Sequence, residues 1–565
     1  MSKINPKRAY AKEILENFSD IGSHGVPLAD DDPALVNFRI REDGSLEKRC
    51  GWRVYENYTE GDVRGAWQGV LNGVSLHFVV CASSVLLLRG NQRSLVSLLS
   101  TNTGEVSFFV YCNALYLMDG RCLRIWDASG MTFRAAEGYV PLYGKGWDPV
   151  NFGEVYEDLN LFTNRLRVQY RSQESATKFM LPYYAESIDF VKVNGIKTTA
   201  YSFSATLDSV TLAEPASFVE IGFTIYLDSE TTQNLLAATR ALPVFLGAGE
   251  QLLLYGAPRG HYLYLARAVS DSMLATARSG YPTCDRLYFR ESDVMIIGDA
   301  DNPITTVCRD GQRLLAFHPT GAAAVVFPEE EEPTYYAMSE IPGCSVRGMD
   351  ISVGGDRYIL NATGLFRLVH DSGSPDDLRA IALNVSLPLD DPDLHANLLT
   401  AYLSTHDEIW LRDARDTKGG VYVYQPLRQY FYRFDHIPAQ RLLTVNGLFG
   451  FFCGNNVCVF EEHLTTDANV AFEAVATTGW LHFGCPETKK RSLRLSLLAH
   501  NTRELKITLE SEHRQCKISR TGAPLSSCVW DTRVPIGRFR TLRTVIRDRG
   551  VQRPRITRLA LYANL

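Results

Sequence analysis

The sequence predicts an all-β protein. Tyr and Phe occur 27 times each and Met only 8 times in 565 residues, and strands favour aromatic side chains because these fit a pleated, half-buried surface. Asn-Gly and Asp-Gly pairs, such as Asn72-Gly73 and Asn194-Gly195, separate short apolar runs along the chain. These pairs tolerate the positive φ angles of type I′ hairpin turns. Helical periodicity almost disappears after the N-terminal segment, so we expect repeated antiparallel hairpins.

Residues 1–36 are predicted to form an N-terminal arm. Residues 11–18 have the pattern of a short helix, and the run Asp30-Asp31-Asp32-Pro33 should end any regular structure. The first residues are charged and lack the apolar core of a secretory signal. The longest apolar stretch, near residues 74–82, is too short to cross a bilayer. We therefore expect a chain made in the cytoplasm, with no membrane-spanning segment.

A recurring unit occupies residues 37–149 and returns in residues 246–470. It consists of an apolar strand, a tight turn and another strand that carries an aromatic residue. The clearest copies lie at residues 106–127, 356–369, 407–435 and 442–461. Units of roughly 40–50 residues, repeated several times, are typical of the four-stranded blades of a β-propeller. We predict a propeller of about six or seven blades, divided between these two segments.

Two stretches depart from this pattern. Residues 150–245 contain longer, cleanly alternating runs at 187–195 and 208–227, which predict a β-domain inserted between blades. Strand patterns at residues 478–498, 504–510 and 540–561 predict a terminal β-sandwich across residues 471–565.

Basic residues crowd into this predicted sandwich. From Leu481 to the end there are 18 Lys or Arg and 6 Asp or Glu, and the whole chain has a net charge of −6. Residues 481–565 therefore have a net charge of about +12, and residues 1–480 have about −18. Arg makes bidentate contacts with carboxylate or phosphate groups. Contact with a nucleic-acid backbone, docking on an acidic protein surface and a solvated sandwich face all remain open. The candidate interaction residues are Lys489, Lys490, Arg491, Arg494, Arg538, Arg540, Arg543, Arg547 and Arg549.

Catalytic and metal-binding motifs do not stand out. The sequence has no G-x-x-x-x-G-K-[ST] phosphate loop, no H-E-x-x-H zinc motif and no G-x-S-x-G nucleophile motif. The densest acidic cluster, Asp390, Asp391 and Asp393 with His395, offers hard oxygen ligands, but its spacing does not fit an EF-hand. Pro392 within it favours a solvated loop between blades. We expect no catalytic residue, no metal ligand and no cofactor.

Three segments resemble, in order, the propeller-type tail proteins of tailed bacteriophages, a group that contains tail hub, nozzle and packaged-DNA stabilisation proteins. One segment is similar to the part that leads into their first blade: Asn37-Phe38-Arg39, Gly44, Leu46, Lys48-Arg49 and Gly51. Another resembles their inserted domain: residues 160–169, residues 191–195, Val210-Thr211-Leu212 and Pro215. The last resembles their sandwich: Thr478-Gly479-Trp480 with Lys489-Lys490-Arg491.

This resemblance implies a structural, non-enzymatic virion protein. Copies would form a ring in the tail, for example a hexamer, around the channel through which DNA leaves during genome ejection. The implied partners are further copies of the chain, other tail or head–tail connector proteins, and exiting DNA contacted non-specifically. The alternative is a propeller that binds or cleaves glycans in host-surface recognition. Cleavage requires two carboxyl groups at a defined separation across a cleft.

Overall fold

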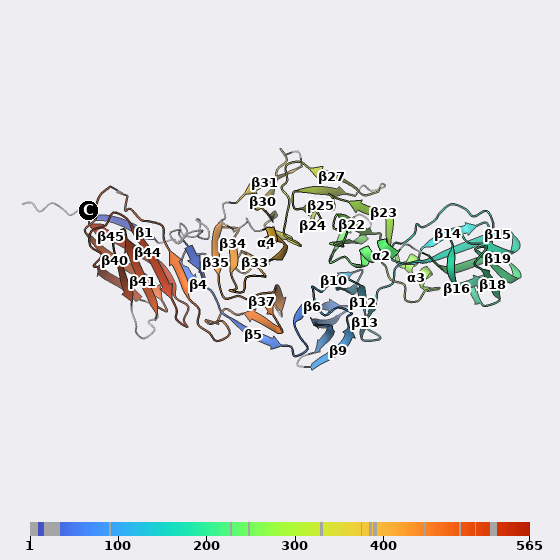
Figure 1. Ribbon diagram of the computed structural model, residues 1–565, viewed down its shortest axis with the longest axis horizontal. Coiled ribbons are helices and arrows are strands. Elements are labelled where there is room, and N and C mark those ends of the chain that lie inside the picture. The colour runs from blue at the N-terminus through green and yellow to red at the C-terminus, as the bar shows by residue number, and fades with distance from the viewer. Residues whose placement is uncertain are drawn as a thin grey trace, which may run out of the picture. The chain divides into compact units, whose positions relative to one another are not determined.

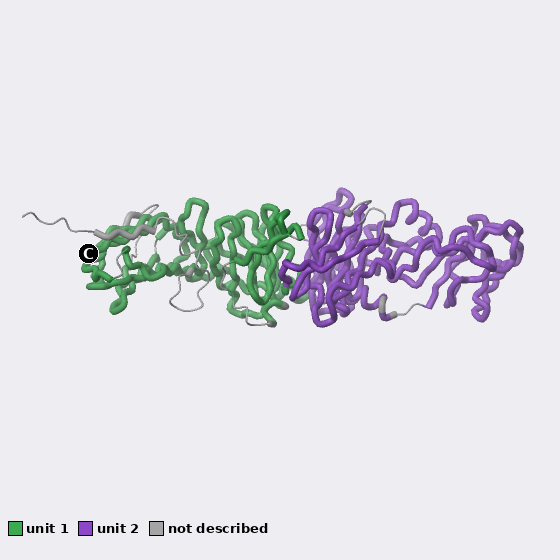
Figure 2. Tube along the Cα trace, turned by 90° about the horizontal axis from the view of Figure 1, so that it is seen from above, with its two compact units in different colours: residues 1–63, 345–565 green, residues 64–344 purple. Residues whose placement is uncertain are grey.

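The computed structural model describes residues 10–15, 34–89, 92–226, 229–246, 249–327, 332–374, 376–383, 387, 392–445, 447–484, 487–502, 504–519 and 528–564. Strands account for 57% of the structure and helices for 4%, so the predicted all-β class is confirmed. The chain divides into two compact units (Figure 2). Unit 1 comprises residues 1–63 and 345–565, and unit 2 comprises residues 64–344.

Unit 2 contains four blade sheets, each a four-stranded antiparallel meander of consecutive strands (Figure 1). Their strands are β6 (Val63–Leu71), β7 (Val74–Cys81), β8 (Ser84–Arg89) and β9 (Gln92–Leu98); β10 (Ser107–Tyr111), β11 (Ala114–Met118), β12 (Leu123–Asp127) and β13 (Thr132–Ala135); β20 (Arg240–Leu246), β21 (Gly249–Tyr255), β22 (Tyr262–Ala266) and β23 (Phe289–Ile296); β24 (Thr306–Asp310), β25 (Arg313–His318), β26 (Gly321–Val326) and β27 (Thr334–Met338). Aromatic side chains fill the space between neighbouring sheets. Phe78 of β7 packs edge to face on Trp126 and Phe133 of the next sheet, at centroid distances of 4.8 and 5.1 Å.

Unit 1 contains three more sheets of the same kind. Their strands are β28 (Ile351–Val353), β29 (Asp356–Asn361), β30 (Gly364–His370) and β31 (Leu378–Ala382); β32 (Leu398–Leu403), β33 (Glu408–Asp413), β34 (Val421–Gln425) and β35 (Tyr430–Phe434); β36 (Arg441–Val445), β37 (Leu448–Cys453) and β38 (Asn456–Phe460) with β5 (Trp52–Asn57). The last sheet joins distant parts of the chain, because β5 pairs with β38 in antiparallel register from Trp52↔Phe460 to Asn57↔Asn456. The described residues thus contain six separate four-stranded blade sheets and a seventh four-stranded blade, β32 to β35, that continues into a nine-stranded sheet, in agreement with the predicted six or seven blades.

The hairpins explain why the repeats were visible in the sequence. Strands β10 to β12 occupy the unit predicted at residues 106–127, and β36 to β38 the unit at 442–461. Asn72 and Gly73 have φ angles of 50° and 77°, as a type I′ turn requires. At Asp310-Gly311, by contrast, only the glycine has a positive φ (60°), because β24 extends through Asp310 and the turn begins one residue later.

The inserted domain is a six-stranded sheet in unit 2. Its strands are β14 (Leu142–Trp147), β15 (Arg165–Met180), β16 (Ala185–Val193), β17 (Ile196–Thr198), β18 (Tyr201–Ser204) and β19 (Ser209–Ile225). The long strands β15 and β19 run antiparallel at its centre. Two helices of the unit, α2 (Ser229–Leu236) and α3 (Asp271–Arg278), follow this sheet in sequence. We predicted the insertion at residues 150–245, whereas the sheet begins at Leu142 and a blade strand, β20, already begins at Arg240.

The C-terminal sandwich lies in unit 1 and has two sheets. One continues from β35 through β2 (Ala34–Val36) to β39 (Ala474–Thr477), β44 (Leu542–Asp548), β41 (Leu505–Ser511) and β42 (Gln515–Ser519). The other contains β3 (Phe38–Ile40), β4 (Leu46–Lys48), β45 (Arg555–Asn564), β40 (Ser492–His500) and β43 (Cys528–Val534), with β1 (Tyr10–Leu15) beside β45. Their inner faces form one core with residues such as Leu495, Leu497, Ile507 and Ile546.

The N-terminal segment belongs to this sandwich. The helix predicted within residues 11–18 is wrong where the structure describes it, because β1 pairs antiparallel with β45 from Tyr10↔Asn564 to Leu15↔Leu559. Strands β3 and β4, placed by the sequence in the first propeller segment, also lie in the same sheet as β45. Local periodicity does not reveal such pairing, since the partners are about 500 residues away in sequence.

Candidate functional site: a buried polar junction and an aromatic pocket

Asn37 anchors a buried polar junction in unit 1. Its φ of 57° lies in the left-handed region, which Asn adopts more readily than most residues. The side-chain amide Nδ2 donates to the carbonyl oxygen of Glu473 at 2.7 Å. The Oδ1 atom accepts from Arg49 Nε and from the backbone N–H of Asp435, both at 2.9 Å. One residue between β2 and β3 therefore holds the end of β35 and the start of β39.

Arg49 forms a bidentate ion pair in this junction. Its Nη1 and Nη2 atoms donate to the two carboxylate oxygens of Asp467 at 2.9 and 2.6 Å. The guanidinium also lies 3.9 Å from the centroid of the Phe472 ring. Burial raises the pKa of Asp467, although the charge of Arg49 opposes this shift. A planar guanidinium suits this geometry because a carboxylate accepts both of its parallel donors.

Arg39 and Lys48 form two further buried ion pairs. Arg39 Nη2 donates to Glu408 Oε2 at 3.2 Å, and Glu408 also accepts from Trp410 Nε1 at 3.0 Å and from the Tyr432 hydroxyl at 2.7 Å. Burial would lower the pKa of Arg39, but the Glu408 carboxylate raises it above its ordinary value. Lys48 Nζ donates to Asp548 Oδ2 at 3.0 Å.

These contacts explain the motif at residues 37–51. Asn37, Arg39, Lys48 and Arg49 are all buried, and each is paired with a group from a blade sheet, from the sandwich or from the segment between them. Gly51 is also required, because a Cβ atom there would lie 1.9 Å from the carbonyl oxygen of Thr466. The motif therefore joins the sandwich sheet of β3 and β4 to β44 of the other sandwich sheet and to β33 of a blade.

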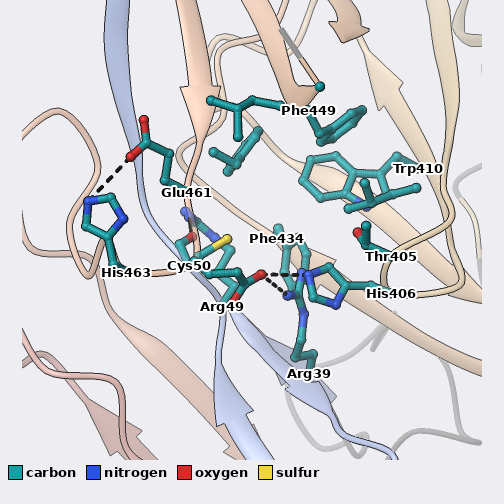
Figure 3. Close-up of a pocket in the computed structure, with 15 residues that line it drawn as sticks. Arg39, Arg49, Cys50, Thr405, His406, Trp410, Phe434, Phe449, Glu461 and His463 are labelled. Atoms are coloured by element: carbon teal, nitrogen blue, oxygen red, sulfur yellow. Dashed lines mark hydrogen bonds and ion pairs between the residues drawn. The ribbon is translucent and has the colours of Figure 1, made fainter. Parts of the chain in front are cut away.

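A pocket of about 550 Å³ opens beside this junction (Figure 3). Its inner wall is aromatic: Trp410 of β33 packs edge to face on Phe449 of β37 at 4.9 Å and on Phe460 of β38 at 5.3 Å. The turn between β32 and β33 contributes Thr405 and His406 to the lining. The pocket thus lies between two neighbouring blade sheets of unit 1, and Arg39 contributes to its lining.

Two glutamates line the pocket, and both are held by cations. Glu461 accepts from Arg53 Nε at 2.8 Å. Glu462 lies 2.7 Å from His406 Nε2 and accepts from Arg553 Nη1 at 3.0 Å. The hydrogen bond with His406 holds the pKa of Glu462 well below its ordinary range, and Arg553 lowers it further. A general acid for glycoside cleavage needs a raised pKa instead, so Glu462 is not suited to that role.

The predicted basic residues do not form one uniform surface. Lys490 is buried, and its Nζ donates to the carbonyl oxygen of Arg540 at 2.7 Å. Arg494 of β40 pairs with Asp531, whereas Arg543 of β44 pairs with Glu510 at 2.6 Å in the other sheet of the sandwich. The exposed side chains of this set are Lys489, Arg491, Arg494, Arg538, Arg540, Arg547 and Arg549.

Acidic partners interleave with these arginines. Glu473 accepts from Arg549 Nε at 2.9 Å and lies 3.7 Å from Arg547 Nη1. Both arginines line a polar groove of about 600 Å³ on the sheet face formed by β39, β44, β41 and β42, together with Glu473, Glu504 and Glu510. The net basic charge of the sandwich therefore appears at its surface as a mixture of both signs.

The acidic cluster near residue 390 is only partly described. Asp390 and Asp391 lie outside the described residues. Pro392–Asn397 form a short helix, α4, and His395 within it is 6% exposed. The predicted solvated loop is therefore wrong for this part. Among the described residues no group of three or more His, Cys, Asp or Glu side chains is arranged to hold a metal ion.

The chain matches no protein-family model and no curated protein. Similar solved structures include PorZ, an essential surface component of the type-IX secretion system of Porphyromonas gingivalis, with 12% identity and a TM-score of 0.36 over 85% of this chain and 46% of PorZ. The CNH domain of AfRom2 has 7% identity and a TM-score of 0.35, covering 73% of this chain and 99% of that domain. YCF48 bound to D1 peptide has 11% identity and a TM-score of 0.31, covering 74% of this chain and 97% of YCF48. The chain thus spans less than half of PorZ.

The pocket was not predicted from the sequence. Trp410, Phe434 and Phe460 were visible as strand residues of the repeated unit, but nothing marked them as neighbours. His406 and Glu462 stand 56 residues apart and meet only because adjacent blades bring their turns together. The described residues also contain no helix long and apolar enough to cross a membrane.

Proposed function

We propose that this protein is a structural component of a phage tail, assembled as a ring around the path of the exiting DNA. The main support is the buried junction at residues 37–51, together with the resemblance of that segment to tail proteins. Three buried cations, Arg39, Lys48 and Arg49, tie the N-terminal strands to blades and sandwich. Removing one partner from a buried ion pair typically costs about 3–5 kcal/mol. Such a junction suits a virion protein that must transmit mechanical force without its strands separating.

The sandwich is the proposed contact surface for neighbouring copies or other tail proteins. Its exposed side chains Arg547 and Arg549 lie beside the carboxylate of Glu473. A surface of mixed sign favours a complementary protein patch, since both charge types can be matched. A DNA-binding groove would instead present cations without interleaved acids. We therefore favour protein docking over DNA contact among the three interpretations of the basic cluster.

Virion association and ring assembly test this proposal. Purified tailed particles should contain the chain, and cryo-EM of the isolated protein or of the particle should show a closed ring. A paired charge reversal on the sandwich surface, Arg538→Glu with Arg540→Glu, should weaken assembly, because both side chains are exposed. The matched control is Lys197→Glu in β17 of the inserted domain, an exposed residue far from the sandwich in sequence.

Two outcomes would count against the proposal. One is a strictly monomeric chain that never accompanies virions. The other is assembly that is unchanged by the double reversal but lost through the inserted-domain control. Binding of duplex DNA that weakens steeply with salt and with the double reversal would favour the DNA interpretation instead.

A further inference from the structure

The aromatic pocket of unit 1 has the construction of a small-ligand site. Its volume of about 550 Å³ lies within the range of about 300–1,000 Å³ that such sites occupy. Apolar side chains dominate its inner wall, and its polar lining residues include Arg39, Thr405, His406, Glu461 and Glu462. Figure 3 shows Arg39 close to His406, and Glu461 beside His463. This combination offers a ligand both a stacking surface and directed hydrogen bonds.

Arg39 has one donor atom that the described residues do not satisfy. Its side chain is only 6% exposed, and its Nε lies 3.1 Å from Glu408 Oε1, whereas its Nη1 lacks a hydrogen-bond acceptor within the described part of the chain. Nη1 lies 3.8 Å from Glu462 Oε1, which is an ion-pair distance and too long for a hydrogen bond. A buried donor without an acceptor costs about 1–3 kcal/mol. An oxygen atom delivered by a ligand would remove this cost.

The charges that surround the pocket are already balanced. Arg39 is paired with Glu408, Arg49 with Asp467 and Arg53 with Glu461. Glu462 is paired with Arg553. An anionic ligand would meet the carboxylates of Glu461 and Glu462, and a cationic ligand would meet the Arg39 guanidinium. The favoured ligand is therefore neutral.

We propose that this pocket binds a neutral saccharide ring. The C–H face of the ring would pack against Leu448 and Phe449, a hydroxyl oxygen would accept from Arg39 Nη1, and another hydroxyl would donate to Glu462. An apolar amino-acid side chain of a partner protein would fill the aromatic part but leave Arg39 unsatisfied. This inference goes beyond the proposed structural role in the tail, because the protein would also bind a glycan, without cleaving it.

Saturation-transfer NMR on the full chain tests this site directly. The probes are uncharged sugars (glucose, galactose, rhamnose and N-acetylglucosamine), with benzoate and benzylamine as charged aromatic probes and toluene as an apolar one. At least one sugar should receive saturation from the protein. The charged probes should receive little, because each meets a like charge at the rim or on the pocket wall.

Two variants connect the binding to this pocket. Thr405→Trp places a large side chain at the rim from an exposed turn position, and it should reduce the sugar signal by about fivefold or more through blocked access. Glu462→Gln should weaken sugar binding about tenfold, the effect expected when a hydrogen bond to a charged group is lost. Glu186→Gln, an exposed position in β16 of the inserted domain, is the matched control and should bind as the unaltered chain does.

Several outcomes would overturn the inference. One is that no sugar receives saturation from the protein. Another is that the sugar signal is the same with and without Thr405→Trp. The last is that toluene or a charged probe binds in the pocket while the sugars do not. If Thr405→Trp proves unfolded by circular dichroism, Leu448→Trp at the start of β37 tests the same blockade. Ring assembly and virion association are measured separately, so failure of sugar binding leaves the structural proposal standing.

Discussion

At the scale of single residues, Glu408 is the group on which the junction most depends. It is fully buried and is hydrogen-bonded to Arg39, Trp410 and Tyr432. Glu408→Gln should destabilise the protein by about 3–5 kcal/mol, because the Arg39 charge would remain buried without its partner. Urea unfolding followed by near-ultraviolet circular dichroism measures the change.

The control for this prediction is an exposed ion pair. Glu230→Gln breaks the contact with Arg259, whose side chain is 43% exposed while that of Glu230 is 67% exposed. Exposed pairs contribute about 0–1 kcal/mol, so the unfolding midpoint should barely move. Equal effects of the two substitutions would show that the buried pair has no special role.

Glu462 gives a residue-scale prediction about acid stability. Its pKa is lowered in the folded protein, first by the hydrogen bond with His406 and also by Arg553. A lowered carboxyl pKa contributes stability above the unfolded-state value, and this contribution is lost as the pH falls through the folded-state value. Thermal unfolding between pH 6 and pH 3 should therefore depend less steeply on pH in Glu462→Gln than in the unaltered chain. Parallel pH profiles would contradict the assignment.

At the scale of elements, close packing at Gly51 positions strand β5. A methyl group there would lie 1.9 Å from the carbonyl oxygen of Thr466, and backbone atoms cannot move aside as a flexible side chain can. Gly51→Ala should destabilise the protein by about 1–3 kcal/mol or more, the usual cost of overpacking. Gly249→Ala is the matched control, since its Cβ would meet only the Ala268 methyl at 3.8 Å. A midpoint change of the same size in both variants would refute the packing argument.

The sequence predicted some strands of this fold correctly and missed others. Hairpin units were predictable because their determinants are local: the apolar runs of β10 and β11 and the Asn72-Gly73 turn act within a few residues. The positions of β1, β3 and β4 were not, because the sheet that they join is built on β45, about 500 residues further along the chain. The motif at residues 37–51 stood out by its resemblance to the tail proteins, yet no local pattern marked its ion-pair partners Glu408, Asp467 and Asp548.

At the scale of the whole molecule, the junction makes distant parts of unit 1 interdependent. Strands β5 and β38 belong to one sheet although they lie about 400 residues apart in sequence, and β4 pairs with β45 near the C-terminus. Arg49 lies between β4 and β5, and it donates to Asn37, between β2 and β3, and to Asp467, between β38 and β39. Disturbing this single residue should therefore loosen several segments together.

Hydrogen exchange on the variant Arg49→Met tests this interdependence. Methionine retains an apolar stem but removes the bidentate contact with Asp467, so that carboxylate would remain buried without its cation. Amides of β4, β5, β38 and β45 should all exchange faster than in the unaltered chain, since cooperative opening involves contiguous structural units. Amides of β15 and β19, which belong to unit 2, should keep their original rates. Faster exchange confined to the residues beside position 49 would mean that the junction acts only locally, and the mechanical argument for the structural role would lose its main support.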